Sequence, residues 1–293
     1  MTRPERIKVL DRNSRTARLT LLAHLDHAPY PVDDRVAGFF NDSNPPPGER
    51  HRFIGDNRYG EAAHYQDNRV LIHVPPSFDP TAPSRTLLFL HGHYSELLDA
   101  VCHRHAVADQ LNRSGCNAIL VAPQLAKNAA DSHSGKLSVA GGAKRLLDEV
   151  FDELGNWPDI DIAAAARHAS IVIVAFSGGY RAAADLLTGS GLEDRIEGVL
   201  LFDALYSKLE KFENWRRNQK NAFFISFNSE STATNSDTLF RRLEAAGHTV
   251  EHRLPNNIST GMTVSLAVKT AHLEIPRAGP PEGPIAEVLT RLV

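Results

Sequence analysis

The stretch from Ser170 to Tyr180 reads Ser-Ile-Val-Ile-Val-Ala-Phe-Ser-Gly-Gly-Tyr, and it decides the fold. Residues 171–176 are apolar without alternation, which is typical of a strand that helices cover on both faces. A serine and two glycines follow at once, and residues 180–187 have the composition of a helix. A buried strand, a tight turn and a helix in this order form the repeating unit of a parallel α/β sheet.

The same alternation of strands and helices continues on both sides of this stretch. The predicted strands span residues 70–74, 86–90, 118–122, 170–176, 198–202, 222–227 and 249–254. The predicted helices span residues 97–111, 143–154, 180–187, 206–215, 237–246 and 285–292, with a short helix within residues 12–22. We therefore predict an α/β fold, a three-layer α/β/α sandwich around a mostly parallel, doubly wound sheet.

The composition is that of a globular protein without a strong charge bias. The 293 residues carry a formal net charge of −3, and 42% of them are hydrophobic. No basic field is present to attract nucleic acid or an anionic membrane, so neither is expected as a partner. No apolar run approaches the ~20 residues of a membrane span, and the beginning of the chain has no signal-peptide pattern. We expect a cytoplasmic protein.

Two cysteines, Cys102 and Cys116, are too few for a disulfide framework and too far apart for a structural zinc site. We interpret them as core thiols in a reducing compartment. A single bridge between them remains an alternative.

Ser177 stands on the turn between the predicted strand and the predicted helix. Such a turn raises a serine hydroxyl above the sheet, as in a nucleophile elbow, and favours small residues two positions before and after it. Ala175 and Gly179 are small, although Ala175 replaces the usual glycine. The backbone N–H of Gly178 would face a developing oxyanion. The alternative is a plain glycine-rich turn that cradles a phosphate, but no Walker lysine follows.

A second turn, His91-Gly92-His93, ends the strand 86–90. We expect that strand to lie two sheet positions from the serine strand. The backbone N–H of His93 is the candidate for the second oxyanion donor. The His91 side chain is expected to support the loop.

The candidate base is His272, because it lies after the last predicted strand and before the closing helix. Two carboxylates compete for the role of the acid. Asp203 ends the strand that follows the serine strand, and Glu230 ends the next one. Asp203 is favoured because it is held tightly at its strand end, whereas Glu230 lies in a loop rich in Ser, Thr and Asn.

With these motifs in this order, the chain resembles the α/β-hydrolase superfamily over about residues 68–293. More narrowly, it resembles a bacterial branch in the segments 89–93, 114–124, 177–180 and 201–206. In that branch the Asp-Ala-Leu-Tyr segment follows the strand after the nucleophile, which adds weight to Asp203. The resemblance supplies no substrate. The chain is accordingly divided into an N-terminal extension (1–60) and a catalytic α/β-hydrolase domain (61–293). Whether the extension caps the sheet edge, covers the site or contacts a second subunit in a homodimer is left open.

The resemblance implies a serine hydrolase with a Ser177–His272–Asp203 triad that needs no metal or organic cofactor. Ester hydrolysis is the leading hypothesis, and hydrolysis of an amide or a peptide comes second. The substrate would be a small-molecule or peptide-like acyl compound. Gln124, Tyr180 and Tyr206 follow strand ends and are the candidate substrate-binding residues.

Two rival functions come from other classes. A metal-dependent hydrolase would use the pairs His91/His93 and His103/His105 with Asp203 as ligands. A two-residue step on a helix points side chains to different faces, which argues against joint ligation by the second pair. A binding protein that keeps an inert elbow is the non-enzymatic alternative.

Overall fold

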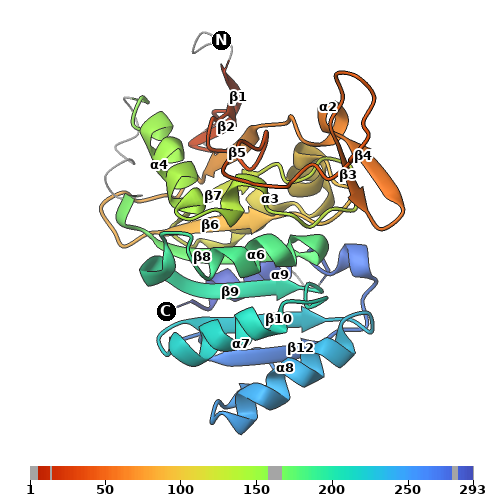
Figure 1. Ribbon diagram of the computed structural model, residues 1–293. Coiled ribbons are helices and arrows are strands. Elements are labelled where there is room, and N and C mark those ends of the chain that lie inside the picture. The colour runs from red at the N-terminus through yellow and green to blue at the C-terminus, as the bar shows by residue number, and fades with distance from the viewer. Residues whose placement is uncertain (1–5, 14, 158–166, 279–282, 293) are drawn as a thin grey trace.

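The computed structural model describes residues 6–13, 15–157, 167–278 and 283–292, and ten of its strands form one sheet. The strands from β7 to β11 run parallel, whereas β1, β2 and β5 are each antiparallel to the next strand in the sheet (Figure 1). The spatial order is β1 (Ile7–Asp11), β2 (Leu19–His24), β5 (Arg69–Val74), β7 (Ala118–Pro123), β6 (Arg85–Leu90), β8 (Ser170–Phe176), β9 (Ile196–Phe202), β10 (Phe223–Asn228), β12 (Thr263–Ala267) and β11 (Val250–Glu251).

Helices cover both faces of the sheet. One face carries α4 (Gly142–Leu154), α6 (Tyr180–Leu186), α7 (Leu209–Asn218) and α8 (Ala233–Ala245), and the other carries α3 (Val107–Ser114) and α9 (Pro284–Thr290). In β8, Ile171 and Ile173 pack in the first layer, and Val172 and Val174 pack in the second. This two-sided burial explains why the β8 sequence does not alternate. The predicted three-layer sandwich is confirmed.

The N-terminal segment is more regular than its composition indicates. The helix predicted within residues 12–22 is wrong, because β2 begins at Leu19. A short apolar run such as Leu19–Ala23 fits a buried strand as well as a helix. Further along, β3 (His51–Ile54) and β4 (Asn57–Gly60) form a separate hairpin, followed by the short helix α2 (Glu61–His64). The division of the chain at residue 60 stays a prediction, but β1 and β2 are strands of the main sheet.

Two further predictions need correction. The helix predicted over residues 97–111 is broken into a π-helical turn, η1 (Asp99–Arg104), and α3, because Ala106 has a left-handed φ of 47° between them. The strand predicted over 249–254 shrinks to the two residues of β11. On its outer side β10 pairs with β12, which was not predicted from the sequence. The five residues of β12 follow a loop that contains Pro-Asn-Asn, and they show only a weak alternation of apolar and polar residues. Short 3₁₀ turns lie at η2 (Gly135–Ser138) and η4 (Glu193–Arg195).

The order of the central strands brings four strand ends together. β6 lies directly beside β8, not two positions away as predicted. The chain leaves β6 for β7 on one side and returns to β8 on the other, so the sheet reverses its winding here. In open α/β sheets such a reversal opens a crevice at the carboxyl ends of the strands. The ends of β6, β8, β9 and β10 therefore lie side by side.

Candidate active site

Ser177 occupies a sharp bend between β8 and α6. The bend is the 3₁₀ turn η3 (Ser177–Gly179), and Ser177 has a φ of 49°, which a side chain other than glycine rarely adopts. A Cβ atom on Gly179 would lie 2.3 Å from the carbonyl oxygen of Leu90, so only glycine fits there. The strained turn raises the serine side chain at the edge of the sheet, which is the geometry of a nucleophile elbow.

A chain of two hydrogen bonds runs from this serine through an imidazole to a carboxylate. His272 Nε2 lies 2.9 Å from Ser177 Oγ, and His272 Nδ1 lies 2.6 Å from Asp203 Oδ2. His272 begins the short turn η5 (His272–Glu274), which follows β12. The three residues follow different strands. Ser177 and His272 are 95 positions apart in the chain, and Asp203 and His272 are 69 positions apart. Their order along the chain is serine, aspartate, histidine.

Asp203 is fully buried directly after β9 and is surrounded by donors. Its Oδ1 atom accepts from the backbone N–H of Ser229 at 3.0 Å and from Thr232 Oγ1 at 2.5 Å. Its Oδ2 atom accepts from Ser229 Oγ at 2.6 Å and Ser231 Oγ at 2.8 Å, besides His272. Burial raises the pKa of Asp203, but the hydrogen bonds from His272, Ser229 and Thr232 outweigh it and hold the pKa well below its usual range. The carboxylate is therefore ionised at neutral pH.

The competing carboxylate, Glu230, lies in the loop after β10 that supplies these donors, but its side chain is exposed. Among the hydrogen bonds of the described residues, none joins the Glu230 side chain to His272. Its neighbours Ser229, Ser231 and Thr232 turn toward Asp203 instead. The sequence does contain a sign of these three donors, which is the run Ser-Glu-Ser-Thr after β10. Because β10 pairs with β9, hydroxyl groups that follow β10 can reach a carboxylate that follows β9. The sequence analysis predicted only a loop rich in Ser, Thr and Asn at this place.

The turn after β6 lies over the serine. A Cβ atom on Gly92 would come within 2.9 Å of Ser177 Cβ, so the two turns touch. The backbone N–H of His93 has no hydrogen-bond acceptor among the residues that the structure describes. The His93 imidazole lies against Gly178, where an added Cβ would be 2.2 Å from His93 Cδ2, and its Nε2 atom lies 2.6 Å from Ser132 Oγ. Burial lowers the pKa of His93.

Gln124 is not available to a substrate, which corrects its predicted role. Its side chain is fully buried. The amide oxygen accepts from the N–H of Leu97 at 2.7 Å, and the amide nitrogen lies 2.8 Å from His91 Nε2. His91 Nε2 also accepts from the N–H of Leu125, and His91 Nδ1 lies 2.8 Å from the carbonyl of Gly92. Gln124 and His91 thus brace the loop after β6.

Aromatic side chains form the rim of the site. Tyr206 is 38% exposed, and its ring centroid lies 6.2 Å from the rings of Tyr180 and His272. The Tyr206 hydroxyl lies 2.9 Å from Ser231 Oγ. Tyr94 is also exposed, directly after His93. The rim therefore combines ring surfaces with hydroxyl groups.

A buried histidine that the sequence analysis considered only as a metal ligand lies behind the site. His105 is fully buried, and neither of its ring nitrogens has a hydrogen-bond partner among the described residues. Its ring packs 4.6 Å from Phe176, whose own ring lies 4.9 Å from His272. Burial lowers the pKa of His105 to about 3. His105 is neutral at neutral pH and acts as packing.

The residues of the metal alternative do not converge. The His91 nitrogens are both engaged by the loop, and His93 contacts Ser132. Within the described ranges, no group of three or more His, Cys, Asp or Glu side chains is arranged to hold a metal ion. Both cysteines are free thiols, so the alternative bridge does not form.

The order of the parallel strands, the bend at Ser177 and the sequence of the three site residues define the α/β-hydrolase fold. No family model and no curated protein matches the sequence. Solved structures with a similar chain path include a feruloyl esterase module from Clostridium thermocellum, at 12% identity and a TM-score of 0.49, with 89% of this chain and 93% of that chain covered.

A second is an S-formylglutathione hydrolase from Agrobacterium tumefaciens, at 10% identity and a TM-score of 0.42, with 85% of this chain and 95% of that chain covered. A third is an esterase from Thermogutta terrifontis, at 12% identity and a TM-score of 0.43, with 83% of this chain and 91% of that chain covered. At such distances one fold hosts many activities, so these proteins assign no substrate. None of the helices in the described ranges combines the length and apolar composition of a transmembrane segment.

Proposed function

We propose that this chain is a serine hydrolase that cleaves carboxylic esters through an acyl-enzyme. The observation that carries the proposal is the unbroken contact from Ser177 Oγ to His272 Nε2 at 2.9 Å and from His272 Nδ1 to Asp203 at 2.6 Å. A serine is a weak nucleophile by itself and needs an adjacent base that a third group orients. All three parts are within hydrogen-bond reach.

In the proposed reaction, Ser177 Oγ attacks the acyl carbon while His272 accepts the serine proton. Asp203 fixes the imidazole so that Nδ1 carries a proton and Nε2 is free to act as the base, and it stabilises the imidazolium that forms. The tetrahedral oxyanion is held by the N–H groups of Gly178 and His93. His272 then protonates the leaving alcohol, and a water attacks the acyl-serine by the reverse route.

Support for His93 as an oxyanion donor comes from its backbone N–H, which has no acceptor in the described part of the chain, and from the close approach of its turn to Ser177. Tyr180 and Tyr206 are proposed to flank the substrate, because they follow the nucleophile and the acid by three residues each and their rings lie 6.2 Å apart. The rim suits an acyl or alcohol group that offers both an apolar surface and polar atoms.

Labelling with a fluorophosphonate probe tests the proposal. We expect a covalent adduct on the peptide that contains Ser177, no adduct in Ser177→Ala, and full labelling in Ser77→Ala, which removes an exposed serine. A panel of p-nitrophenyl esters and matching anilides of increasing acyl length then separates ester from amide hydrolysis. If folded protein gives no adduct on Ser177, the chain is a binding protein with an inert elbow. Loss of ester hydrolysis in a chelator would favour the metal-dependent alternative.

A further inference from the structure

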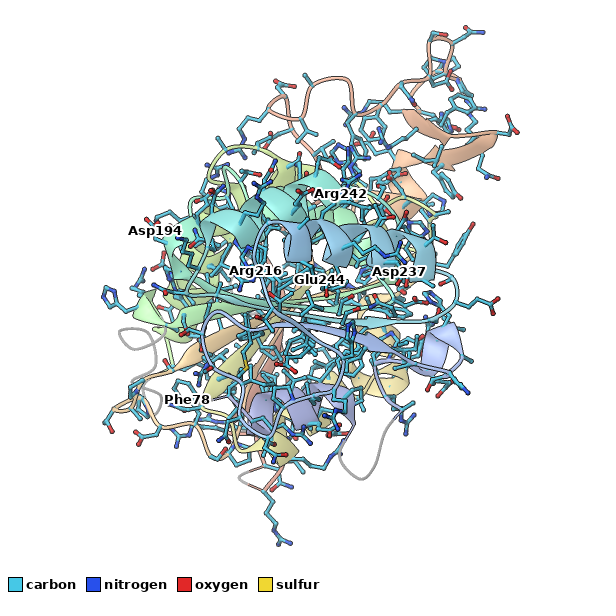
Figure 2. All side chains as sticks on the ribbon, turned by 90° about the horizontal axis from the view of Figure 1, so that it is seen from below. Phe78, Asp194, Arg216, Asp237, Arg242 and Glu244 are labelled. Carbon is cyan, nitrogen blue, oxygen red and sulfur yellow. The ribbon has the colours of Figure 1, made fainter. Side chains whose placement is uncertain are left out.

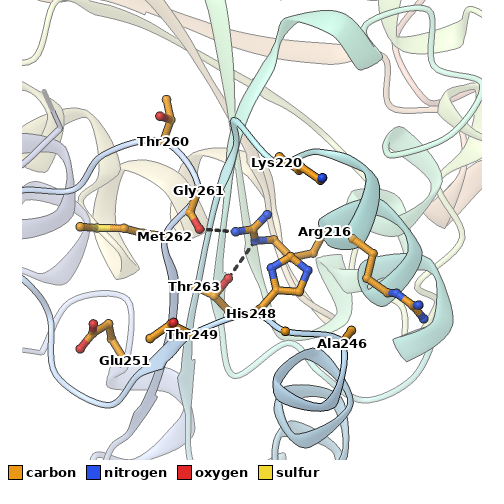
Figure 3. A pocket seen from close by; sticks show the side chains of 12 residues that line it. Arg216, Lys220, Ala246, His248, Thr249, Glu251, Thr260, Gly261, Met262 and Thr263 are labelled. Carbon is orange, nitrogen blue, oxygen red and sulfur yellow. Dashed lines mark hydrogen bonds between the residues drawn. The ribbon is translucent and has the colours of Figure 1, made fainter.

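A cavity of about 690 Å³ lies at the amino ends of β10, β12 and β11. These strands run parallel, and the candidate active site lies at the carboxyl ends of the central strands. The cavity therefore lies at the opposite ends of the strands from the candidate active site. Its wall comes from the end of α7, the loop between α8 and β11, and the loop before β12 (Figure 3). Neither Ser177 nor Asp203 nor His272 lines it.

Arg216 is the buried cation of this cavity, with 2% of its surface exposed. It lies beside α8 and close to the sheet (Figure 2). Its guanidinium donates to Thr263 Oγ1 at 2.8 Å, to the carbonyl of Gln219 at 2.9 Å and to the carbonyl of Gly261. All three acceptors are neutral, and within the described ranges no carboxylate pairs with Arg216. A guanidinium has five N–H donors, so two remain without an acceptor in that part of the chain.

A buried charge without an opposite charge is costly, even when neutral groups accept its hydrogen bonds. Burial lowers the pKa of Arg216, in keeping with this missing compensation. The position of Arg216 in the last turn of α7 offsets part of the cost through the helix dipole. The remainder of this cost and the two spare donors are what a bound anion would compensate.

The other charges in the wall have the same sign, with one exception. Arg217 and Lys220 are exposed at the cavity, and Lys220 has no ion pair with any described residue. Burial lowers the pKa of His248, and the positive charges of Arg216, Arg217 and Lys220 lower it further. Three cations thus lie near His248, and one of them, Arg217, is also paired with Glu213 Oε1 at 3.4 Å. Glu251 is the sole carboxylate among the described residues that line the cavity.

We propose that this cavity binds a small organic anion through its phosphate or carboxylate group, with Arg216 as the central contact and Lys220 and Arg217 as outer contacts. Guanidinium groups match the geometry of both kinds of oxyanion. The volume lies in the range of small-molecule sites and exceeds what a single phosphate ion fills. The remaining wall, which includes Met262 and Thr249, would contact the organic part.

Calorimetric titration of the full chain with inorganic phosphate, citrate and adenosine monophosphate at constant ionic strength tests this site. Arg216 also links α7 to β12 through its hydrogen bond to Thr263, so Arg216→Met could unfold the protein. The test therefore changes exposed residues of the wall. We expect Lys220→Gln to weaken binding about tenfold and Glu251→Gln to strengthen it severalfold, because the two changes alter the local charge in opposite directions. Lys8→Gln, on the opposite edge strand β1, is the matched control and should leave the affinity unchanged.

A preference for adenosine monophosphate over citrate would assign the site to phosphates, and the reverse order would assign it to carboxylates. The proposal is overturned if none of the three anions binds more tightly than chloride, or if Lys220→Gln, Glu251→Gln and Lys8→Gln all change the affinity equally. Since binding is measured directly, the result is independent of whether the chain hydrolyses esters.

Discussion

Thr232 holds the carboxylate oxygen of Asp203 that His272 does not touch. Its hydroxyl lies 2.5 Å from Oδ1, whereas His272 Nδ1 lies 2.6 Å from Oδ2. Both residues are on loops that follow different strands, and Thr232 is itself buried. The carboxylate is therefore clamped from two sides, and its orientation toward the imidazole depends on a hydroxyl that takes no direct part in the chemistry.

Replacing Thr232 by valine should destabilise the protein by about 1–3 kcal/mol, because a buried charge loses a donor while the side-chain shape is kept. The pKa of Asp203 should rise at the same time. Urea unfolding at neutral pH measures the loss of stability. Thr234→Val, an exposed threonine two positions further along the chain, should change stability by less than about 0.5 kcal/mol and serves as the control. Equal effects of the two changes would contradict the clamp.

The assignment of the acid predicts a contrast between two conservative changes. Asp203→Asn should slow fluorophosphonate labelling and ester turnover by about 10⁴-fold with folding intact, because the imidazole is then held in the wrong tautomer. Glu230→Gln should change either rate by less than about twofold, since its side chain is exposed and the hydrogen bonds of His272 go to Asp203 and Ser177. A large effect of Glu230→Gln with a small effect of Asp203→Asn would transfer the role to Glu230.

Two glycines at the bend should respond differently to alanine. In Gly179→Ala the new methyl group would meet the backbone oxygen of Leu90 at 2.3 Å, so we expect a large loss of stability and of soluble protein. In Gly178→Ala the methyl group meets the His93 ring, which can move. That variant should fold but label slowly, and adding His93→Ala should restore part of the labelling rate. Failure of Gly178→Ala to fold would show that the His93 ring is fixed.

Stability should fall as the solution is acidified below about pH 6.5. Burial lowers the pKa of His91 to about 4 and that of His105 to about 3, from an ordinary value of 6.5. Between these values the unfolded chain binds protons that the folded chain excludes, so the free energy of unfolding decreases with falling pH. The slope is about 1.4 kcal/mol per pH unit for each histidine.

His105→Leu isolates this effect, because the His105 ring makes no hydrogen bond to any residue that the structure describes. Urea unfolding at pH 7, 6 and 5 should give a slope reduced by about 1.4 kcal/mol per pH unit below pH 6.5. Stability at pH 7 should be unchanged or higher, since the change removes two buried nitrogens that have no partner in the described ranges. A slope equal to that of the unaltered protein would mean that His105 is protonated in the fold.

Much of the fold was predictable because the central strands carry unambiguous patterns. The apolar run in β8 and the residues that follow it predict both the layers and the bend at Ser177. The short elements were harder. β12 is stabilised by pairing with β10 over five residues, and that pairing connects segments far apart in the chain. The residues near Thr263 in the sequence therefore give little indication of a strand.

The site shows the same division. Residues 177, 203 and 272 could be chosen from their places relative to strands and helices, since the chain order of such sites is fixed by topology. The burial of Gln124 could not, because a polar residue at a strand end serves a loop as readily as a ligand. The hydroxyls around Asp203 depend on the adjacency of β9 and β10, which a linear reading treats as separate segments.

The two outermost strands have a consequence for how this protein behaves when concentrated. An open sheet offers unpaired backbone groups that can recruit another chain and grow into aggregates. Here one border is only two residues long, at Val250–Glu251, and the other is irregular between Val9 and Asp11 and carries the charged Lys8. Both features make a border a poor template for a further strand, so they disfavour self-association through the backbone at both ends of the ten-stranded sheet.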